Sequence, residues 1–446
     1  MNGRLLLILL SAPLMAGPRE DFARGVLEAA RGKDPIDWYQ KALAADPEAW
    51  PLVRKVAGLE TARGGIEAAS TLYREFAARH PERLEAQLAY ADFLGEVSPR
   101  DDFAAKLAGE SLEKALVRFP GSIGVRRRLF RSYEQRGMRE RSLAMFDEVE
   151  KSESPGMARF GLELARNLFE ADDQQAQSRV DAMLDRAMAS FPGNAGLAKA
   201  ASEYFRTSGR LDRAVAVLEQ HVAAAPSSLE LRTRLGILLF AADRGEEGVR
   251  VLREVLEIDP RRWLAHQALA KYFRKVDRPE EARAHAAERL KLRGGDASEF
   301  AELAQEWLDA DEPRNARLLL EKGVFDAPED AELAALLAVA TRRDPETASR
   351  AAGRFREAEA LSGNDGPAAQ PDFQLAFAGY LIESGKPELA EAKLRSAIKG
   401  YPPEAREETA AALRQLADLW DAQGKNEAAA KSLRRRAEAL IPAESK

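Results

Sequence analysis

The chain of 446 residues contains no cysteine. Disulfide bonds, zinc–thiolate sites and cysteine nucleophiles are therefore excluded, and the redox compartment cannot be inferred from cysteine usage. Only four histidines are present, and they form neither an HExxH motif nor a pair at metal-ligand spacing. β-branched residues are sparse, so the sequence offers little material for strands. Glycine and proline, at 30 and 22 residues, are too few to indicate long disordered tracts.

Neither sign of charge dominates, because the chain has 67 lysines and arginines and 73 aspartates and glutamates, which gives a formal net charge of −6. Phosphate contacts need a basic face, so this composition disfavours a general nucleic-acid binder. Gly64-Gly65 and Gly294-Gly295 do not open a GxxxxGK[ST] phosphate loop, and no GxSxG elbow is present. His266 and His285 are near enough in sequence to meet, but a packed pair is a commoner explanation than a metal site. We expect no catalytic site, no cofactor and no metal.

Proline returns at a fixed interval in the middle of the chain. Pro192, Pro226 and Pro260 are 34 residues apart, and the series continues through Gly294 to Pro328. Four further columns keep this period: the small residues Ser202, Gly236, Ala270 and Ala304; the small residues Ala214, Gly248, Ala282 and Ala316; the large apolar residues Phe205, Leu239, Phe273 and Trp307; and the turn residues Gly209, Asp243, Asp277 and Asp311. A fixed period of this size indicates stacked repeats.

Each column has a physical reason. Within a unit, apolar residues recur at helical spacing in two blocks, so each unit is predicted to be two helices. The turn column needs a residue that tolerates the left-handed conformation, which explains glycine and aspartate. The small columns are expected where the paired helices approach closely, and proline ends the second helix.

These columns resemble the tetratricopeptide repeat. In the unit that opens at Ala297, the family's positions are occupied by Ala304, Trp307, Ala316, Leu320 and Pro328. The resemblance covers nearly the whole chain, and the residues that define its repeats are Ala57, Ala69, Pro81, Gly137, Ala214, Gly236, Gly248, Pro260, Ala270, Ala282, Ala304, Ala316, Pro328, Ala378, Ala390, Pro402, Ala417 and Ala429. It implies an all-α fold, an α-solenoid of about twelve helix-turn-helix repeats that forms a right-handed superhelix.

The solenoid is expected over residues 18–362, as about ten repeats of which some are degenerate, and over residues 372–446, as two repeats and a tail. Residues 363–371 interrupt the pattern, either as a hinge between two sub-solenoids or as a long loop on an unbroken stack. The immediate return of an alanine-rich helical pattern favours the loop.

The segment 1–17 carries an apolar stretch, Leu5 to Leu10, behind a single arginine. It is too short to span a bilayer as a helix and suits a signal peptide. A clean small-X-small cleavage site is missing, so a hydrophobic cap on the first repeat or a misassigned start codon are the alternatives. We expect no stable membrane span and a periplasmic or secreted protein, with the cytoplasm as the alternative location.

The resemblance also implies a binding surface, because certain first-helix positions of tetratricopeptide folds line a concave groove. Carried onto the fourth to eighth units, these positions include four acidic residues: Glu134, Glu170, Glu203 and Glu230. They also include nine basic residues: Arg127, Arg131, Arg159, Arg166, Lys199, Arg206, Lys271, Arg274 and Lys275. A locally positive groove would suit a protein or peptide partner with an acidic segment or a C-terminal carboxylate. The alternative is that these are ordinary solvated helix faces.

We therefore expect a non-enzymatic protein–protein interaction scaffold within a bacterial cell-envelope or secretion assembly. The first alternative is a regulatory or adaptor subunit of an enzyme complex whose catalysis lies on another chain. The second is a helical-repeat RNA binder, which the period of 34 and the acidic total disfavour.

Overall fold

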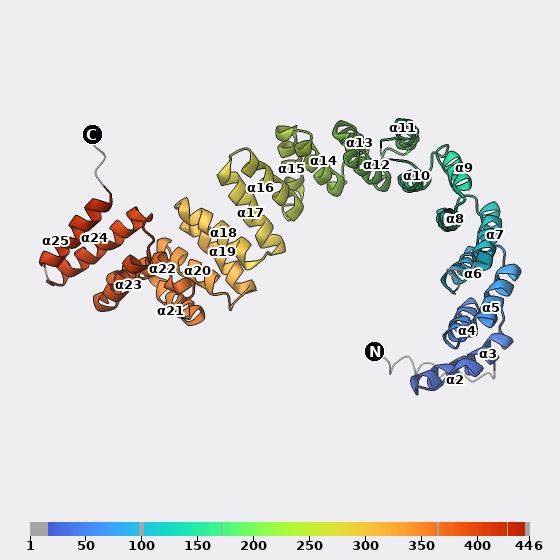
Figure 1. Ribbon diagram of the computed structural model, residues 1–446, viewed down its shortest axis with the longest axis horizontal. Coiled ribbons are helices and arrows are strands. Elements are labelled where there is room, and N and C mark those ends of the chain that lie inside the picture. The colour runs from blue at the N-terminus through green and yellow to red at the C-terminus, as the bar shows by residue number, and fades with distance from the viewer. Residues whose placement is uncertain (1–16, 98–101, 171, 364, 426, 442–446) are drawn as a thin grey trace. The chain divides into compact units, whose positions relative to one another are not determined.

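The computed structural model describes residues 17–97, 102–170, 172–363, 365–425 and 427–441. Throughout these residues the regular elements are helical, and consecutive α-helices pair into twelve hairpins (Figure 1). This confirms the all-α solenoid that the 34-residue period predicts. The expected leader, residues 1–17, lies outside the described residues except for Gly17.

The chain forms two compact units, of which unit 1 is Met1–Pro226 and unit 2 is Ser227–Lys446. In every hairpin the first helix carries an even number and is called the A-helix, and the second carries an odd number and is called the B-helix. Unit 1 contains α2 (Pro18–Ala30), α3 (Ile36–Ala45), α4 (Trp50–Ala62), α5 (Ile66–Arg79), α6 (Leu84–Val97), α7 (Asp102–Arg118), α8 (Ile123–Gln135), α9 (Arg139–Val149), α10 (Pro155–Leu168), α11 (Gln174–Ser190), α12 (Ala195–Thr207) and α13 (Leu211–Ala224).

Unit 2 repeats the same hairpin layout. It contains α14 (Leu229–Ala241), α15 (Gly245–Ile258), α16 (Trp263–Lys275), α17 (Pro279–Arg293), α18 (Ala297–Asp309), α19 (Pro313–Asp326), α20 (Ala331–Arg343), α21 (Ala351–Ser362), α22 (Pro371–Glu383), α23 (Pro387–Gly400), α24 (Arg406–Ala422) and α25 (Glu427–Leu440). Two short 3₁₀ helices, η1 (Ala348–Arg350) and η2 (Pro367–Ala369), flank α21.

The turn column behaves as its residue types predict. Gly209 has φ of 72°, and Asp243, Asp277 and Asp311 have φ of 56°, 56° and 57°. These three aspartates are the non-glycine residues with positive φ in the described chain. Aspartate is among the few residues that tolerate this region, so the turn column is a backbone requirement.

The small columns lie where the two helices of a hairpin touch. Gly236 of α14 and Gly248 of α15 are both buried. A Cβ atom added to Gly248 would lie 2.8 Å from the Gly236 carbonyl oxygen and 2.6 Å from a ring carbon of Phe240. The large apolar column is buried as well, since Phe205, Leu239 and Phe273 are 0%, 2% and 0% exposed. The columns therefore encode how closely the helices pack.

The remaining repeat positions follow the same plan, with one shift of register. Pro260 and Pro328 each come two residues after the last residue of a B-helix, as their role in ending that helix predicts. The alanines of the small columns are buried from Ala57 to Ala417. In the last hairpin, however, Ala430 is fully buried and Ala429 only partly so. The fully buried small residue there comes one position after Ala429.

The interruption at residues 363–371 lies within unit 2. Gly363 turns the chain with φ of 61°, and η2 then packs against α20 and α21. The Ala368 amide donates to Ser362 Oγ at 2.7 Å, and Gln374 Nε2 donates to the Ala368 carbonyl at 2.6 Å. Ala368 itself is buried. The described part of this segment is thus anchored to the helices on both sides.

Candidate protein-binding surfaces

Six of the nine predicted basic residues lie on three neighbouring A-helices of unit 1. Helix α10 contacts both α8 and α12. Residues four or seven apart on a helix share a face, so each pair of basic residues on one helix points the same way. All six side chains are exposed: Arg127 and Arg131 on α8, Arg159 and Arg166 on α10, and Lys199 and Arg206 on α12.

Carboxylates neutralise part of this surface. Arg127 pairs with Glu163 of α10 at 2.9 Å, and Arg206 pairs with Glu203 of its own helix at 2.6 Å. Glu163 lies 36 residues from its partner and is not among the groove positions that the resemblance implies. The spacing that could have revealed it is Arg159, Glu163 and Arg166, which follow one stripe of α10.

Three arginines on this face, Arg131, Arg159 and Arg166, form no ion pair with any residue that the structure describes. They come from the adjacent helices α8 and α10. Their side chains are exposed, and each guanidinium group can donate two parallel hydrogen bonds to one carboxylate. These three arginines are called the basic surface below.

The other three predicted residues lie on α16 of unit 2, and two of them form ion pairs. Arg274 pairs with Glu306 of α18 at 3.3 Å, and Lys275 pairs with Asp243 at 3.7 Å. Lys271 is exposed and forms no ion pair within the described chain. Unit 2 therefore offers little free positive charge on this helix.

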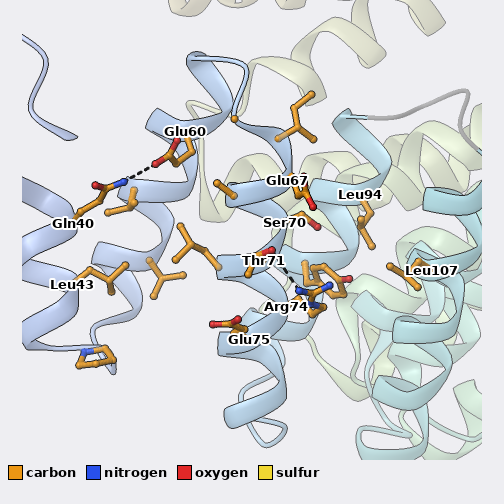
Figure 2. A pocket seen from close by; sticks show the side chains of 18 of the residues that line it. Gln40, Leu43, Glu60, Glu67, Ser70, Thr71, Arg74, Glu75, Leu94 and Leu107 are labelled. Carbon is orange, nitrogen blue, oxygen red and sulfur yellow. Dashed lines mark hydrogen bonds between the residues drawn. The ribbon is translucent and has the colours of Figure 1, made fainter. Parts of the chain in front are cut away.

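A cavity in unit 1 lies across helix α5 (Figure 2). Its volume is about 1410 Å³, and Leu43, Leu94 and Leu107 from the neighbouring helices supply apolar walls. At its edge, Gln40 Nε2 donates to Glu60 Oε1 at 2.7 Å. None of the nine predicted groove residues lines it. The groove positions implied by the resemblance all lie on A-helices. They therefore do not include the residues of this cavity, which lies mainly along the B-helix α5.

The two histidines singled out in the sequence do meet, between α16 and α17. Their Nδ1 atoms are 2.9 Å apart, and His266 Nε2 lies 3.1 Å from the Pro260 carbonyl oxygen. In the neutral pair, His266 donates from Nε2 to this carbonyl and accepts at Nδ1 from His285. Burial, then the nearby His266 and Arg253, lowers the pKa of His285 to about 4. Among the described residues, no three His, Asp or Glu side chains gather as metal ligands would.

No helix in the described part of the chain combines the length and the hydropathy that crossing a bilayer requires. A search of curated proteins finds no match to this sequence. Among solved structures, the chain is similar to PilF of Pseudomonas aeruginosa, with 20% identity and a TM-score of 0.32 over 48% of this chain and 93% of that one. It is also similar to yeast Tom70, with 14% identity and a TM-score of 0.30 over 99% and 93% of the two chains.

A third similar structure is YrrB, described as a tetratricopeptide protein with an unusual peptide-binding site. It shares 14% identity and a TM-score of 0.29 over 42% of this chain and 92% of that one. At these identities and TM-scores, the similarities carry no information about function. A tetratricopeptide repeat family model matches residues 205–272. The hairpins on both sides of this match repeat the same two-helix layout.

Proposed function

We propose that this protein is a non-enzymatic scaffold that holds protein or peptide partners against the A-helix faces of its repeats. Stacked helical repeats bury each unit only against its neighbours and leave long faces free for partners. The observation that supports the proposal is the basic surface of unit 1. Arg131, Arg159 and Arg166 form no ion pair with the described residues, so their charges are available to a partner.

The partner that fits the basic surface carries carboxylates. Arg159 and Arg166 are two turns apart on α10, and Arg131 lies on the neighbouring helix α8. An acidic segment, or an acidic residue together with a C-terminal carboxylate, can place one oxygen pair on each guanidinium group. The setting that we infer is a bacterial cell-envelope or secretion assembly.

Charge reversal at the basic surface tests this function. The variant Arg131→Glu/Arg159→Glu/Arg166→Glu is compared with Lys106→Glu/Lys114→Glu/Arg118→Glu, which makes the same change in net charge on the B-helix α7. Exposed ion pairs are worth about 0.2–1 kcal/mol each, so we expect the first variant to weaken partner capture about tenfold and the control to leave it unchanged. Equal capture by both variants would contradict the proposed surface.

Cross-linking identifies the partner and separates the scaffold from the adaptor alternative. A photo-reactive residue at position 166 is compared with one at position 114 in the native host. If an enzymatic activity co-purifies and is lost when the complex dissociates, the chain is the adaptor subunit of an enzyme. If the cross-linked partners have no activity that depends on the complex, the scaffold function is supported.

We also propose that the chain is exported, because the apolar stretch Leu5 to Leu10 follows a single arginine, as the apolar core of a short signal peptide does. N-terminal sequencing of the protein from its native host tests this. A mature chain that starts near Pro18 supports export, and an intact Met1 contradicts a cleaved leader.

A further inference from the structure

Unit 2 contains a groove on its A-helix side, in repeats that follow the fourth to eighth units for which the groove positions were given above. The groove has a volume of about 1180 Å³ and is lined by residues of α18, α20, η2, α22 and α24. Helix α20 contacts both α18 and α22, so the lining is continuous across these three helices.

The floor of the groove is apolar. Leu336 and Val339 of α20 and Leu375 of α22 are only partly buried, although they pack against the core. Gly379 also lines the groove, and a Cβ atom added there would meet no heavy atom within 4 Å. The space above this part of the floor is therefore open to a ligand side chain.

Carboxylates surround the floor. The six acidic residues that line the groove are Glu302, Glu306, Asp309, Glu332, Asp372 and Glu408. Glu306 is paired with Arg274, and Asp372 accepts a hydrogen bond from the Tyr401 hydroxyl at 2.7 Å. Glu302, Glu332 and Glu408 are exposed and have no ion pair or hydrogen bond with the residues that the structure describes. They come from three different helices.

The positive charges in the lining are already neutralised. Arg342 and Arg343 are the basic residues among those that line the groove. Arg342 pairs with Glu383, and Arg343 pairs with Asp311 at 2.9 Å. Burial and the charges of Asp372 and Glu408 also raise the pKa of the Tyr401 hydroxyl beside the groove. The net field in the groove is therefore negative.

A hydrogen-bond acceptor is also left without a donor. Gln415 of α24 lines the groove, and its Oε1 is buried and receives no hydrogen bond from the described residues. A buried acceptor in this state costs about 1–3 kcal/mol. A ligand that brings N–H donors, such as the ammonium group of a lysine, removes this cost.

We propose that this groove binds a cationic peptide segment of a partner protein. Apolar side chains of the segment cover Leu336, Val339 and Leu375, while lysine or arginine side chains reach Glu302, Glu332 and Glu408. The site goes beyond the basic surface of unit 1, because it lies on a different unit and selects a ligand of opposite charge. One scaffold can then hold two partners of opposite charge at the same time.

The test is fluorescence anisotropy of the full-length chain with a labelled helical peptide of leucine and lysine, and with its leucine–glutamate counterpart. The variant Glu302→Gln/Glu332→Gln/Glu408→Gln removes the free carboxylates. Its matched control, Glu254→Gln/Glu257→Gln/Glu280→Gln, removes three exposed carboxylates from the B-helices α15 and α17. A second variant, Gly379→Leu, fills the open floor without changing any charge.

We expect the leucine–lysine peptide to bind, the leucine–glutamate peptide not to bind, and the carboxylate variant to raise Kd about tenfold or more. Gly379→Leu should raise Kd by a similar factor, and the control triple should leave it within about twofold. Circular dichroism confirms that each variant is folded, and if Gly379→Leu unfolds, the carboxylate variant decides.

Equal weakening by the control triple would show non-specific attraction and overturn the proposal. Binding of both peptides alike would overturn it too. If light scattering shows that the chain self-associates through this groove, and the leucine–lysine peptide does not compete, the occupant is a second copy and the proposal is wrong. Capture of an acidic partner by the charge-reversal variant of unit 1 is measured in a separate experiment. The proposals for the two sites can therefore be contradicted independently of each other.

Discussion

Replacing Gly248 with alanine tests the close helix crossing in α14–α15. Glycine inside a helix normally costs about 0.5–1 kcal/mol relative to alanine, so propensity alone predicts that Gly248→Ala stabilises the protein. The added Cβ, however, would lie 2.8 Å from the Gly236 carbonyl oxygen. This oxygen belongs to the backbone of α14, so relief requires the two helices to move apart. Overpacking of this kind costs about 1–3 kcal/mol.

The expected net result is a loss of about 1–2 kcal/mol in the free energy of unfolding of unit 2, after the gain in helix propensity is subtracted. The matched control is Gly58→Ala in α4, an exposed helix-interior glycine whose Cβ would meet no heavy atom within 4 Å. It should raise stability by about 0.5–1 kcal/mol.

Urea and heat unfolding, followed by circular dichroism, measure both variants against the wild type. The two substitutions are chemically identical and differ only in what surrounds the new methyl group. The structure therefore requires that Gly248→Ala lowers the free energy of unfolding and that Gly58→Ala raises it. If both variants gain stability, the helices are not as close as the crossing implies, and the reading of the small columns as packing positions is refuted.

Two further predictions concern buried polar groups in unit 2. The pKa of His285 is lowered from 6.5 to about 4, so the unfolded chain takes up a proton that the folded chain refuses, and stability should fall as the pH drops from about 6.5 to about 4. The loss of unfolding free energy is about 3 kcal/mol at most, and about 1–2 kcal/mol after discounting for the partial exposure of the ring. Urea midpoints measured as a function of pH should show this loss in the wild type and not in His285→Gln. If the midpoints of the two proteins change with pH in the same way, the prediction is contradicted. Asp344 is buried, and although burial raises its pKa, hydrogen bonds from Arg317 Nε at 2.7 Å and from the Glu346 amide hold it below the ordinary value. Asp344→Asn should cost about 3 kcal/mol, because it leaves a buried guanidinium with Glu321 as its remaining partner; the double variant Arg317→Met/Asp344→Asn should recover part of this loss in thermal unfolding, and no recovery would mean that the unpaired charge is not the cause.

Much of the fold follows from the order of residue types along the chain. The period of 34 residues, the left-handed aspartates such as Asp277, and the glycines Gly236 and Gly248 each state a local requirement of a helical hairpin. Such requirements involve residues close in sequence, so their spacing reveals them. In the last hairpin the fully buried residue is Ala430 and not Ala429, and the spacing does not reveal this difference of one position.

The binding surfaces depend on contacts between repeats, and these were only partly predictable. The exposed arginines Arg131 and Arg166 could be placed on A-helices by their register. The pairing of Arg127 with Glu163 joins two hairpins, and spacing does not say which side chains of neighbouring hairpins meet.

The sequence by itself determined the helical hairpin, its repetition and the residues that pack each hairpin closed. Only the tertiary structure decided which charges remain free and where grooves open. Glu302, Glu332 and Glu408 come from three separate helices, and the stacking of the hairpins brings them to the edge of one apolar floor. The physical reason is that packing within a hairpin depends on residues that are close in the sequence. The electrostatic field at a surface is the sum over charged side chains from several hairpins, and only the stacking of the hairpins brings these side chains together.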